Sequence, residues 1–451
     1  MHSGSLTSCA SAGRHENEHS KRRKSREGQD MISNLPDFII AHILSFLPTK
    51  FAVCTSVLSW RWIYMWTFVT KLSFNDKELP FSYPRESEKT RFMNFVYRVL
   101  LHLNSASIKE FSLEISQNLD SYHINQWISA VSNKSVKKIS IWSLYGCNLS
   151  SYPLLKCQSL EKLVLKTMDR FIIKVSTLVR LSSLTVLNLI GVTFTCYGSN
   201  EPKELTLNLP VLRKFKILRC TWLNVKSVTV EAPLLEVVSL SYNESLADIK
   251  FCVLHLKKFY YCGKTSAETV VLDAEIDSTN IELLNLKEEN VEETFICQLL
   301  RINAKCLKLY LETDWENFVG LQHYLDDIPA FGMLRYLEVN SVPAEVLLGL
   351  LLKSPCLETL VFQMTDFDKE LSDSAIVPDC FLSTLKEVEF ENISGYKWEL
   401  NFAKFVMENA CVLEKISFSF SDKLQGLELE KVKEKLVLIE TSCNIVFIEY
   451  V

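Results

Sequence analysis

The chain has 451 residues, of which 48% are hydrophobic and 23% charged, and its formal net charge at pH 7 is −5. These fractions are ordinary for a globular protein and exclude a chain that is disordered throughout. Only 12 glycines are present, and the two nearest in sequence, Gly191 and Gly198, are seven positions apart, which excludes both a G-x-G-x-x-G fingerprint and a phosphate-binding P-loop.

The start of the chain has no apolar stretch suited to a signal peptide, and no apolar run approaches the ~18 residues of a membrane span. We therefore expect a protein of the nucleus or cytoplasm, or both, that does not bind membranes. Its 14 cysteines should be reduced thiols there. None of them forms a C-x-x-C pair or a zinc-type spacing, so we expect neither a metal nor another cofactor.

Residues 1–30 are rich in serine, glycine, histidine and charge, which predicts a disordered basic tail. His15-Glu16-Asn17-Glu18-His19 matches the H-E-x-x-H pattern of zinc proteases, but it has no apolar helical period around it and no third ligand downstream, so we interpret it as coincidence. A basic run follows at Lys21, Arg22, Arg23, Lys24 and Arg26. It is either a nuclear-import signal or a solvated charge run before a folded domain.

Apolar residues recur at helical spacing in the next segment, which predicts three short helices. The first has Ser33 as its N-cap and ends at Pro48, the second is capped by Thr49, and the third runs from about Ser56 through Trp66. Helices this short carry more apolar side chains than they can bury among themselves. The excess is either a docking surface for a partner or a packing surface for the following domain.

Three strings in this segment are specific. They read Ile32-Ser33-Asn34-Leu35-Pro36, then Ile43-Leu44-Ser45-Phe46-Leu47-Pro48-Thr49-Lys50, then Thr55-Ser56-Val57-Leu58-Ser59 with Arg61-Trp62 and Trp66. Residues 31–77 therefore resemble the plant F-box, which implies docking onto the small adaptor subunit of an SCF-type cullin–RING ubiquitin ligase, and through it onto a cullin. By position, the resemblance implies contacts from Leu35, Pro36, Ile39, Ile43, Leu44, Leu47, Pro48, Val53, Val57 and Trp62.

Two aromatic residues depart from the F-box pattern. Phe38 stands where the family commonly has an acidic residue, and Trp60 stands where it commonly has lysine or arginine. These side chains either weaken or retune the docking, or pack on the next domain.

Beyond a predicted helical linker at 78–104, leucine-rich units of the form Φ-x-x-Φ-x-Φ recur at intervals of 21 to 28 residues. The units begin at Ile108, Val136, Leu160, Leu184, Leu212, Leu235, Leu256, Ile281, Cys306, Leu334, Leu357, Leu385 and Leu413. This interval is typical of leucine-rich repeats and predicts a solenoid over 105–370 with parallel strands on its concave face. Only Cys220 and Asn243 supply the Cys or Asn expected after the strand, so we expect irregular repeats.

Alternate strand residues should point to the concave face, because side chains alternate along a strand. The early units place there Lys138, Trp142, Lys162, Lys166, Lys214, Lys216 and Lys258, and the late units place there Glu312, Glu338, Glu387, Glu389 and Glu391. We hypothesise that this face is electrically bipolar and binds a protein substrate across it. The alternative is an ordinary solvated strand face.

Residues 371–451 contain two further units and a longer helix. They read Val377-Pro378-Asp379-Cys380-Phe381-Leu382, then Leu385-Lys386-Glu387-Val388-Glu389-Phe390 and Ser394-Gly395, followed by an amphipathic helix around Leu400 and Val406. This segment resembles the FBD domain, which in plants follows an F-box and leucine-rich repeats. From the residues alone, it is suited to capping the exposed end of a solenoid.

The sequence thus predicts an α/β protein: a three-helix F-box, an irregular leucine-rich-repeat solenoid and an FBD cap. The eight histidines are scattered, and no nucleophile motif accompanies them, so we predict a non-catalytic protein. Its predicted role is the substrate-recognition adaptor of an SCF-type ubiquitin ligase. The alternative is a protein-binding scaffold whose F-box no longer docks a ligase. Nucleic-acid binding is disfavoured because the chain as a whole is acidic.

Overall fold

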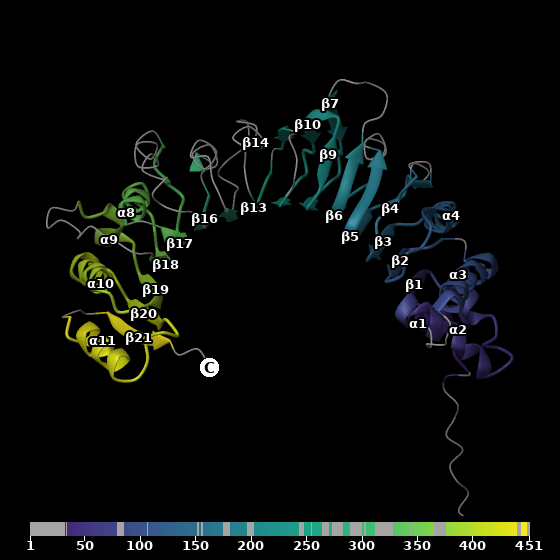
Figure 1. Cartoon of the computed structure of the whole chain (residues 1–451), viewed down its shortest axis with the longest axis horizontal. Helices are drawn as coiled ribbons and strands as arrows, with labels where there is room; N and C mark the ends of the chain where they lie inside the picture. The colour runs from purple at the N-terminus through teal and green to yellow at the C-terminus, as the bar shows by residue number, and fades with distance from the viewer. Residues whose placement is uncertain are drawn as a thin grey trace, which may run out of the picture.

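A computed structural model describes most of the chain beyond the N-terminal tail. The described residues are 32, 34–78, 85–105, 107–150, 153–154, 157–174, 181–195, 203–242, 248–253, 255–263, 270–272, 283–288, 300–301, 304–311, 328–342, 344–364, 376–439 and 443–448. Within these ranges the protein is a mixed α/β structure. Its parallel strands line the inner side of an arc that is open on one side (Figure 1).

The N-terminal end of the arc consists of short helices. They are α1 (Asp37–Leu44), α2 (Thr49–Cys54) and two 3₁₀ helices, η1 (Thr55–Val57) and η2 (Met65–Phe68). Pro36 and Pro48 each occupy the residue before a helix, where φ near −60° is already suited to helix entry. The inward faces of α1 and α2 bury Ile40, Leu44 and Ala52.

Three predictions for this region are wrong. The first helix does not start from Ser33 as its N-cap or continue to Pro48, because α1 spans Asp37–Leu44 and its N-cap is Pro36. The third helix is not continuous, because Ser56 donates a local hydrogen bond to the carbonyl oxygen of Val53 and the Trp62 N–H bonds to the Ser59 carbonyl, so turns replace the helix between η1 and η2. Thr49 is not a cap but the first residue of α2, and its hydroxyl is used elsewhere, as described below.

In the described part of the chain, seventeen strands form one sheet, and every pairing in it is parallel. Along the arc they are β1 (Lys71–Asn75), β2 (Glu110–Ile115), β3 (Lys138–Ser143), β5 (Lys162–Lys174), β6 (Val186–Thr195), β8 (Lys214–Leu218), β11 (Val237–Ser241), β13 (Lys258–Gly263), β15 (Leu283–Glu288), β16 (Cys306–Leu311), β17 (Tyr336–Val342), β18 (Thr359–Met364), β19 (Glu387–Ile393), β20 (Lys415–Phe420) and β21 (Asn444–Ile448). Two short strands, β4 (Cys147–Asn148) and β9 (Thr221–Leu223), extend it beside β5 and β6.

The strands follow the predicted units closely. Twelve of the thirteen units begin two residues before a strand, and neighbouring strands pair residue for residue over their first part. The register shifts farther along between β5 and β6, between β17 and β18, and between β19 and β20. The exception is Cys306, which pairs with Tyr336, so that its unit begins at the buried Ala304 instead. The sheet also includes β1 and β21, which the sequence did not predict.

The outer side of the arc changes character along the chain (Figure 1). Helices cover both ends: α3 (Arg85–His102), α4 (Ser121–Ser132), α8 (Ala344–Leu352), α9 (Asp379–Ser383), α10 (Lys397–Asn409) and α11 (Leu427–Val437). The middle carries a second parallel sheet of β7 (Lys203–Asn208), β10 (Val225–Glu231), β12 (Asp248–Cys252) and β14 (Val270–Leu272). Among the described helices, none has both the length and the apolarity needed to cross a bilayer.

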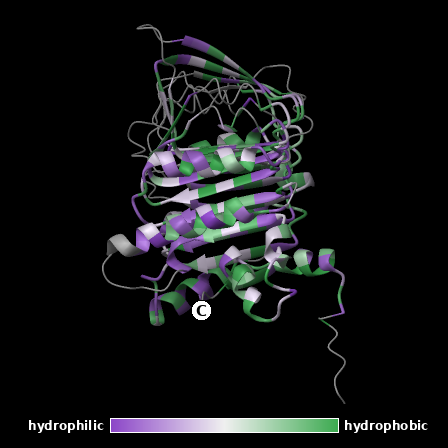
Figure 2. Ribbon diagram, turned by 90° about the vertical axis from the view of Figure 1, so that its right-hand side faces the viewer, coloured by the Kyte–Doolittle hydropathy of each residue, from purple (hydrophilic) through white to green (hydrophobic). Residues whose placement is uncertain are grey.

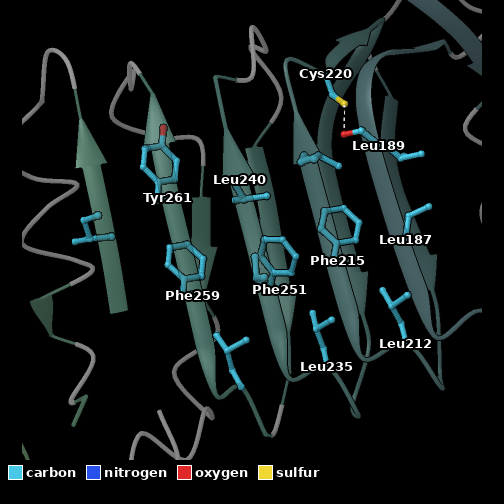
Figure 3. Packing of buried hydrophobic residues seen from close by; sticks show 14 of the residues in the cluster. Leu187, Leu189, Leu212, Phe215, Cys220, Leu235, Leu240, Phe251, Phe259 and Tyr261 are labelled. Atoms are coloured by element: carbon cyan, nitrogen blue, oxygen red, sulfur yellow. Dashed lines mark hydrogen bonds between the residues drawn. The ribbon is translucent and has the colours of Figure 1, made fainter. Parts of the chain in front are cut away.

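The core lies between these two layers. Apolar and polar residues alternate along the inner strands (Figure 2), so that one face of each strand is buried and the other faces the inside of the arc. Leu187, Phe215 and Phe259 stack in rows from strand to strand (Figure 3). Cys220, predicted at the turn after its strand, is buried, and its thiol lies 3.6 Å from the carbonyl oxygen of Leu189 on the preceding strand β6.

Candidate functional site

The short N-terminal helices expose an unusual density of apolar side chains. Of the 28 large apolar side chains that are exposed in the described residues, 11 lie between Ile32 and Phe68. Monomeric proteins rarely expose contiguous apolar patches of more than a few hundred Å² unless the patch binds something. This segment is therefore the first candidate binding surface.

The structure divides the ten predicted docking residues into two groups. Eight are exposed or half-buried: Leu35, Pro36, Ile39, Ile43, Leu47, Pro48, Val53 and Val57. The other two, Leu44 and Trp62, are only 1% and 8% exposed, because both pack into the core. Burial contradicts a direct docking role for these two, so we remove them from the candidate surface.

The two aromatic departures do not pack on the following domain. Phe38 is 70% exposed and Trp60 is 90% exposed. Phe38 borders a hollow of about 680 Å³ between α1 and the first strands, which Ile39, His42, Phe68 and Lys109 also line. Both aromatic side chains thus enlarge the exposed apolar surface.

A polar joint fixes these helices to the edge of the sheet. The N–H of Ser73 in β1 donates to the Thr49 hydroxyl (2.8 Å), and the N–H of Thr70 donates to the Ser45 hydroxyl (3.1 Å). Lys50 adds a hydrogen bond to the Glu78 carbonyl oxygen. Both hydroxyl side chains are buried. The outer edge of β1 is thus satisfied by α1 and α2 rather than by another strand.

Asp76, at the end of β1, extends this joint to β2. Its buried carboxylate accepts the N–H of Ser116 (2.7 Å), the Ser116 hydroxyl (2.8 Å) and the N–H of Gln117 (2.9 Å). Sequence reasoning missed this residue, since nothing near it in the chain indicates partners 40 positions away. We define Ser45, Thr49 and Asp76 as the joint.

The inner face of the sheet is the second candidate surface. The strand register places Lys138, Lys162, Lys214 and Lys258 in one lateral row, with valines of β6 and β11 between the later ones. Trp142, Lys166 and Lys216 lie in neighbouring rows of the same face. Within the described residues, Lys138 is ion-paired with Glu110 on β2, whereas Lys162, Lys166, Lys214, Lys216 and Lys258 have no ion-pair partner.

The late strands carry the predicted carboxylates, but not carboxylates alone. Glu338 on β17 accepts hydrogen bonds from Lys308 and from the hydroxyl of Tyr336, the latter at 2.7 Å. Burial, and next the carboxylates of Glu389 and Glu338, raise the pKa of Glu391. Burial also raises the pKa of Tyr336. Because Lys308 lies beside Glu338, the late part of the inner face is not purely acidic, and the predicted separation of positive and negative charge is incomplete.

Two sets of the predicted site residues lie outside the described residues. They are the basic run at Lys21, Arg22, Arg23, Lys24 and Arg26, and Glu312 of the inner face. Glu387 is described and is exposed at the start of β19, in register with Lys415 on β20.

Comparison with known proteins agrees with this geometry. The F-box domain model matches residues 32–71, which run from just before α1 into β1, and the FBD model matches residues 373–418, from before α9 into β20. An F-box/LRR-repeat protein of Arabidopsis thaliana is 31% identical over 74% of this chain and 92% of its own length. The chain belongs to the plant F-box/FBD/LRR-repeat family.

Two further relatives, both from Arabidopsis thaliana, match over nearly their whole length. An FBD-associated F-box protein is 28% identical over 90% of this chain and 96% of its own length. An F-box/FBD/LRR-repeat protein is 25% identical over 93% of this chain and 95% of its own. The F-box match coincides with the exposed apolar surface, and the FBD match lies at the opposite end of the arc (Figure 1).

Proposed function

We propose that this protein is the substrate-recognition subunit of an SCF-type cullin–RING ubiquitin ligase. The F-box would dock the small adaptor subunit of the ligase, and the strand array, a leucine-rich-repeat solenoid capped by the FBD region, would hold the target. The observation that carries the proposal is the concentration of exposed apolar side chains in the segment that matches the F-box model. Such a surface is stable in water when a partner covers it.

The joint supports this division of labour. A subunit that presents a target to a separate enzyme acts by proximity, and proximity is most effective when the two binding surfaces are held in a fixed relation. Ser45 and Thr49 attach the F-box helices to β1 by hydrogen bonds to buried hydroxyls, and Asp76 then fixes β1 to β2. The target surface and the docking surface are therefore parts of one packed body.

The chemistry of ubiquitin transfer would belong to other subunits. The hollow beside Phe38 is lined by His42 and Ser45, but the Ser45 hydroxyl donates to the Ala41 carbonyl oxygen and accepts the Thr70 N–H, and within the described residues no hydrogen bond joins it to His42. We propose that this chain binds and positions, and that it is not itself catalytic.

The test is binding of the purified full-length chain to the recombinant plant adaptor subunit. Val57→Asp and Leu47→Asp place a charge in the docking surface, and Val437→Asp is the matched control, since Val437 is exposed on α11 at the far end of the arc. The wild type and the control should bind, and both F-box variants should lose most of the affinity while unfolding at the wild-type temperature. No complex with the wild type would leave the scaffold alternative in place of the ligase role.

A further inference from the structure

The inner face from β5 to β13 has a charge pattern that the family assignment does not explain. Its lysines are Lys162 and Lys166 on β5, Lys214 and Lys216 on β8, and Lys258 on β13. The three positions that each of these five strands turns inward are all described, and none of the fifteen is acidic. These five lysines, which we call the lysine face, have no ion-pair partner within the described part of the chain.

The row of residues that immediately precede the strands behaves differently. There Lys137 pairs with Glu161 at 2.6 Å, and Glu236 pairs with Arg213 at 2.8 Å and with Lys257 at 3.9 Å. Lys137, Arg213 and Lys257 are thus neutralised by glutamates that precede neighbouring strands, whereas the lysines of the lysine face are separated from one another by uncharged residues. A run of uncompensated cations on a concave surface raises the local positive potential and attracts an anionic partner.

The spacing of the row points to the shape of that partner. Across β5, β6, β8, β11 and β13 the row reads Lys162, Val186, Lys214, Val237 and Lys258. Neighbouring strands lie about 4.8 Å apart, so successive lysines of the row are about 10 Å apart. A polyproline-II chain has three residues per turn and advances about 3.1 Å per residue, so its side chains three residues apart lie on the same side, about 9–10 Å from one another, whereas in a β-strand they would point to opposite sides. Carboxylates three residues apart would therefore meet successive lysines, over a floor of valine.

We propose that the lysine face binds an acidic segment of the target in the polyproline-II conformation, lying across the strands with its carboxylates three residues apart. This proposal rests on the proposed function, because it assigns a chemical class to the substrate of that adaptor. The observations favour a polypeptide over a single-stranded nucleic acid. Nucleic-acid channels use aromatic side chains as stacking platforms, whereas Tyr260 is the one aromatic residue among the fifteen inward positions, all of them described.

Fluorescence anisotropy with the full-length chain tests this proposal. The probe is a labelled peptide of about a dozen residues with glutamate at every third position and small uncharged residues between, which spans the row. One control peptide has glutamine in place of glutamate, another groups the same glutamates in one block, and a labelled oligothymidylate of similar length is the third. The binding variant is Lys162→Gln/Lys214→Gln/Lys258→Gln. Its matched control is Lys423→Gln/Lys431→Gln/Lys435→Gln, three exposed lysines at the C-terminal end.

The spaced glutamate peptide should bind, the glutamine peptide should not, and added salt should weaken the complex. Three lost ion pairs at a solvated surface should weaken binding by about tenfold in the binding variant, with no change in the control variant. Equal binding by the binding variant and the wild type would overturn the proposal, as would equal affinity for the blocked peptide. Tighter, lysine-dependent binding of the oligonucleotide would overturn the assignment to a polypeptide.

The adaptor-binding assay separates this proposal from the proposed function. The binding variant changes no residue of the F-box, so it should still capture the ligase adaptor with wild-type affinity. A chain that binds the adaptor but not the spaced peptide refutes the lysine-face proposal alone. A chain that binds the peptide but not the adaptor refutes the ligase role alone.

Discussion

Replacing Thr49 by valine tests whether the F-box helices are held to the sheet by side-chain hydroxyls. Valine keeps the shape of threonine but cannot accept the hydrogen bond from the Ser73 N–H, which is 2.8 Å long in the structure. The control is Thr49→Ser, which keeps the hydroxyl and loses only a methyl group. Thr49 is 1% exposed, so water cannot replace the lost acceptor without a local opening.

The expected magnitude follows from that burial. A buried N–H left without a partner costs about 1–3 kcal/mol, and the methyl group that valine adds in place of the hydroxyl offsets less than about 1 kcal/mol of this. We expect Thr49→Val to lower the free energy of unfolding of the N-terminal end of the arc by about 1–2 kcal/mol. Ser45→Ala should have a similar effect, since its hydroxyl both accepts from Thr70 and donates to the Ala41 carbonyl oxygen.

Hydrogen–deuterium exchange resolves this effect locally. In Thr49→Val the amide of Ser73 should exchange about ten times faster or more than in the wild type, while amides of β17 and β18 keep their rates. Thr49→Ser should leave the Ser73 amide protected. If Ser73 were equally protected in all three proteins, the Thr49 hydroxyl would not be its partner and would not hold α2 to β1.

Three other predictions concern single sites. Asp76→Asn removes the charged acceptor of three hydrogen bonds, so it should lower the free energy of unfolding by about 2–3 kcal/mol, measured by denaturant titration. A decrease of less than about 0.5 kcal/mol would contradict that network. Burial and neighbouring carboxylates raise the pKa of Glu391 in the folded protein, so the charged form of this side chain opposes folding above that pKa. Glu391→Gln should therefore raise the melting temperature by about 1–2 °C near neutral pH. This gain in melting temperature should shrink as the pH falls through the raised pKa. Cys54 is exposed on α2, whereas burial raises the pKa of the Cys380 thiol to about 12. A thiol reagent at mildly alkaline pH should therefore label Cys54 quickly and Cys380 only on unfolding. Bound adaptor should slow the labelling of Cys54.

The spacing of apolar residues was enough to predict the strands of the arc. The unit Φ-x-x-Φ-x-Φ places one buried face on each strand, and this local signal survives wherever the apolar residues are large. It failed at Cys306, where the equivalent position is Ala304 and a small side chain weakens the pattern. It also missed β1, whose residues alternate correctly but lie within the stretch that resembles an F-box.

The candidate sites were predictable only in part, because burial depends on neighbours that are distant in the sequence. Ile43 and Leu44 are adjacent in one helix and equally apolar, yet Leu44 packs into the core and Ile43 is exposed. Lys138 and Lys162 occupy equivalent positions in their units, but Glu110 on the neighbouring strand pairs with Lys138 alone. The strand pattern predicts which face a side chain occupies, whereas its partner depends on the lateral register.

The parallel ladder makes this protein a one-dimensional chain of contacts. Each strand of the arc bonds chiefly to the strand before and the strand after it, so the free energy of folding is coupled mainly between neighbouring strands. The two ends of the ladder differ. Buried hydroxyls of the F-box helices accept hydrogen bonds at the outer edge of β1. At the opposite end, the residues of β21 are only partly buried or exposed. Opening should therefore start at the C-terminal end, and a break in a central strand such as β6 would uncouple the two halves of the arc.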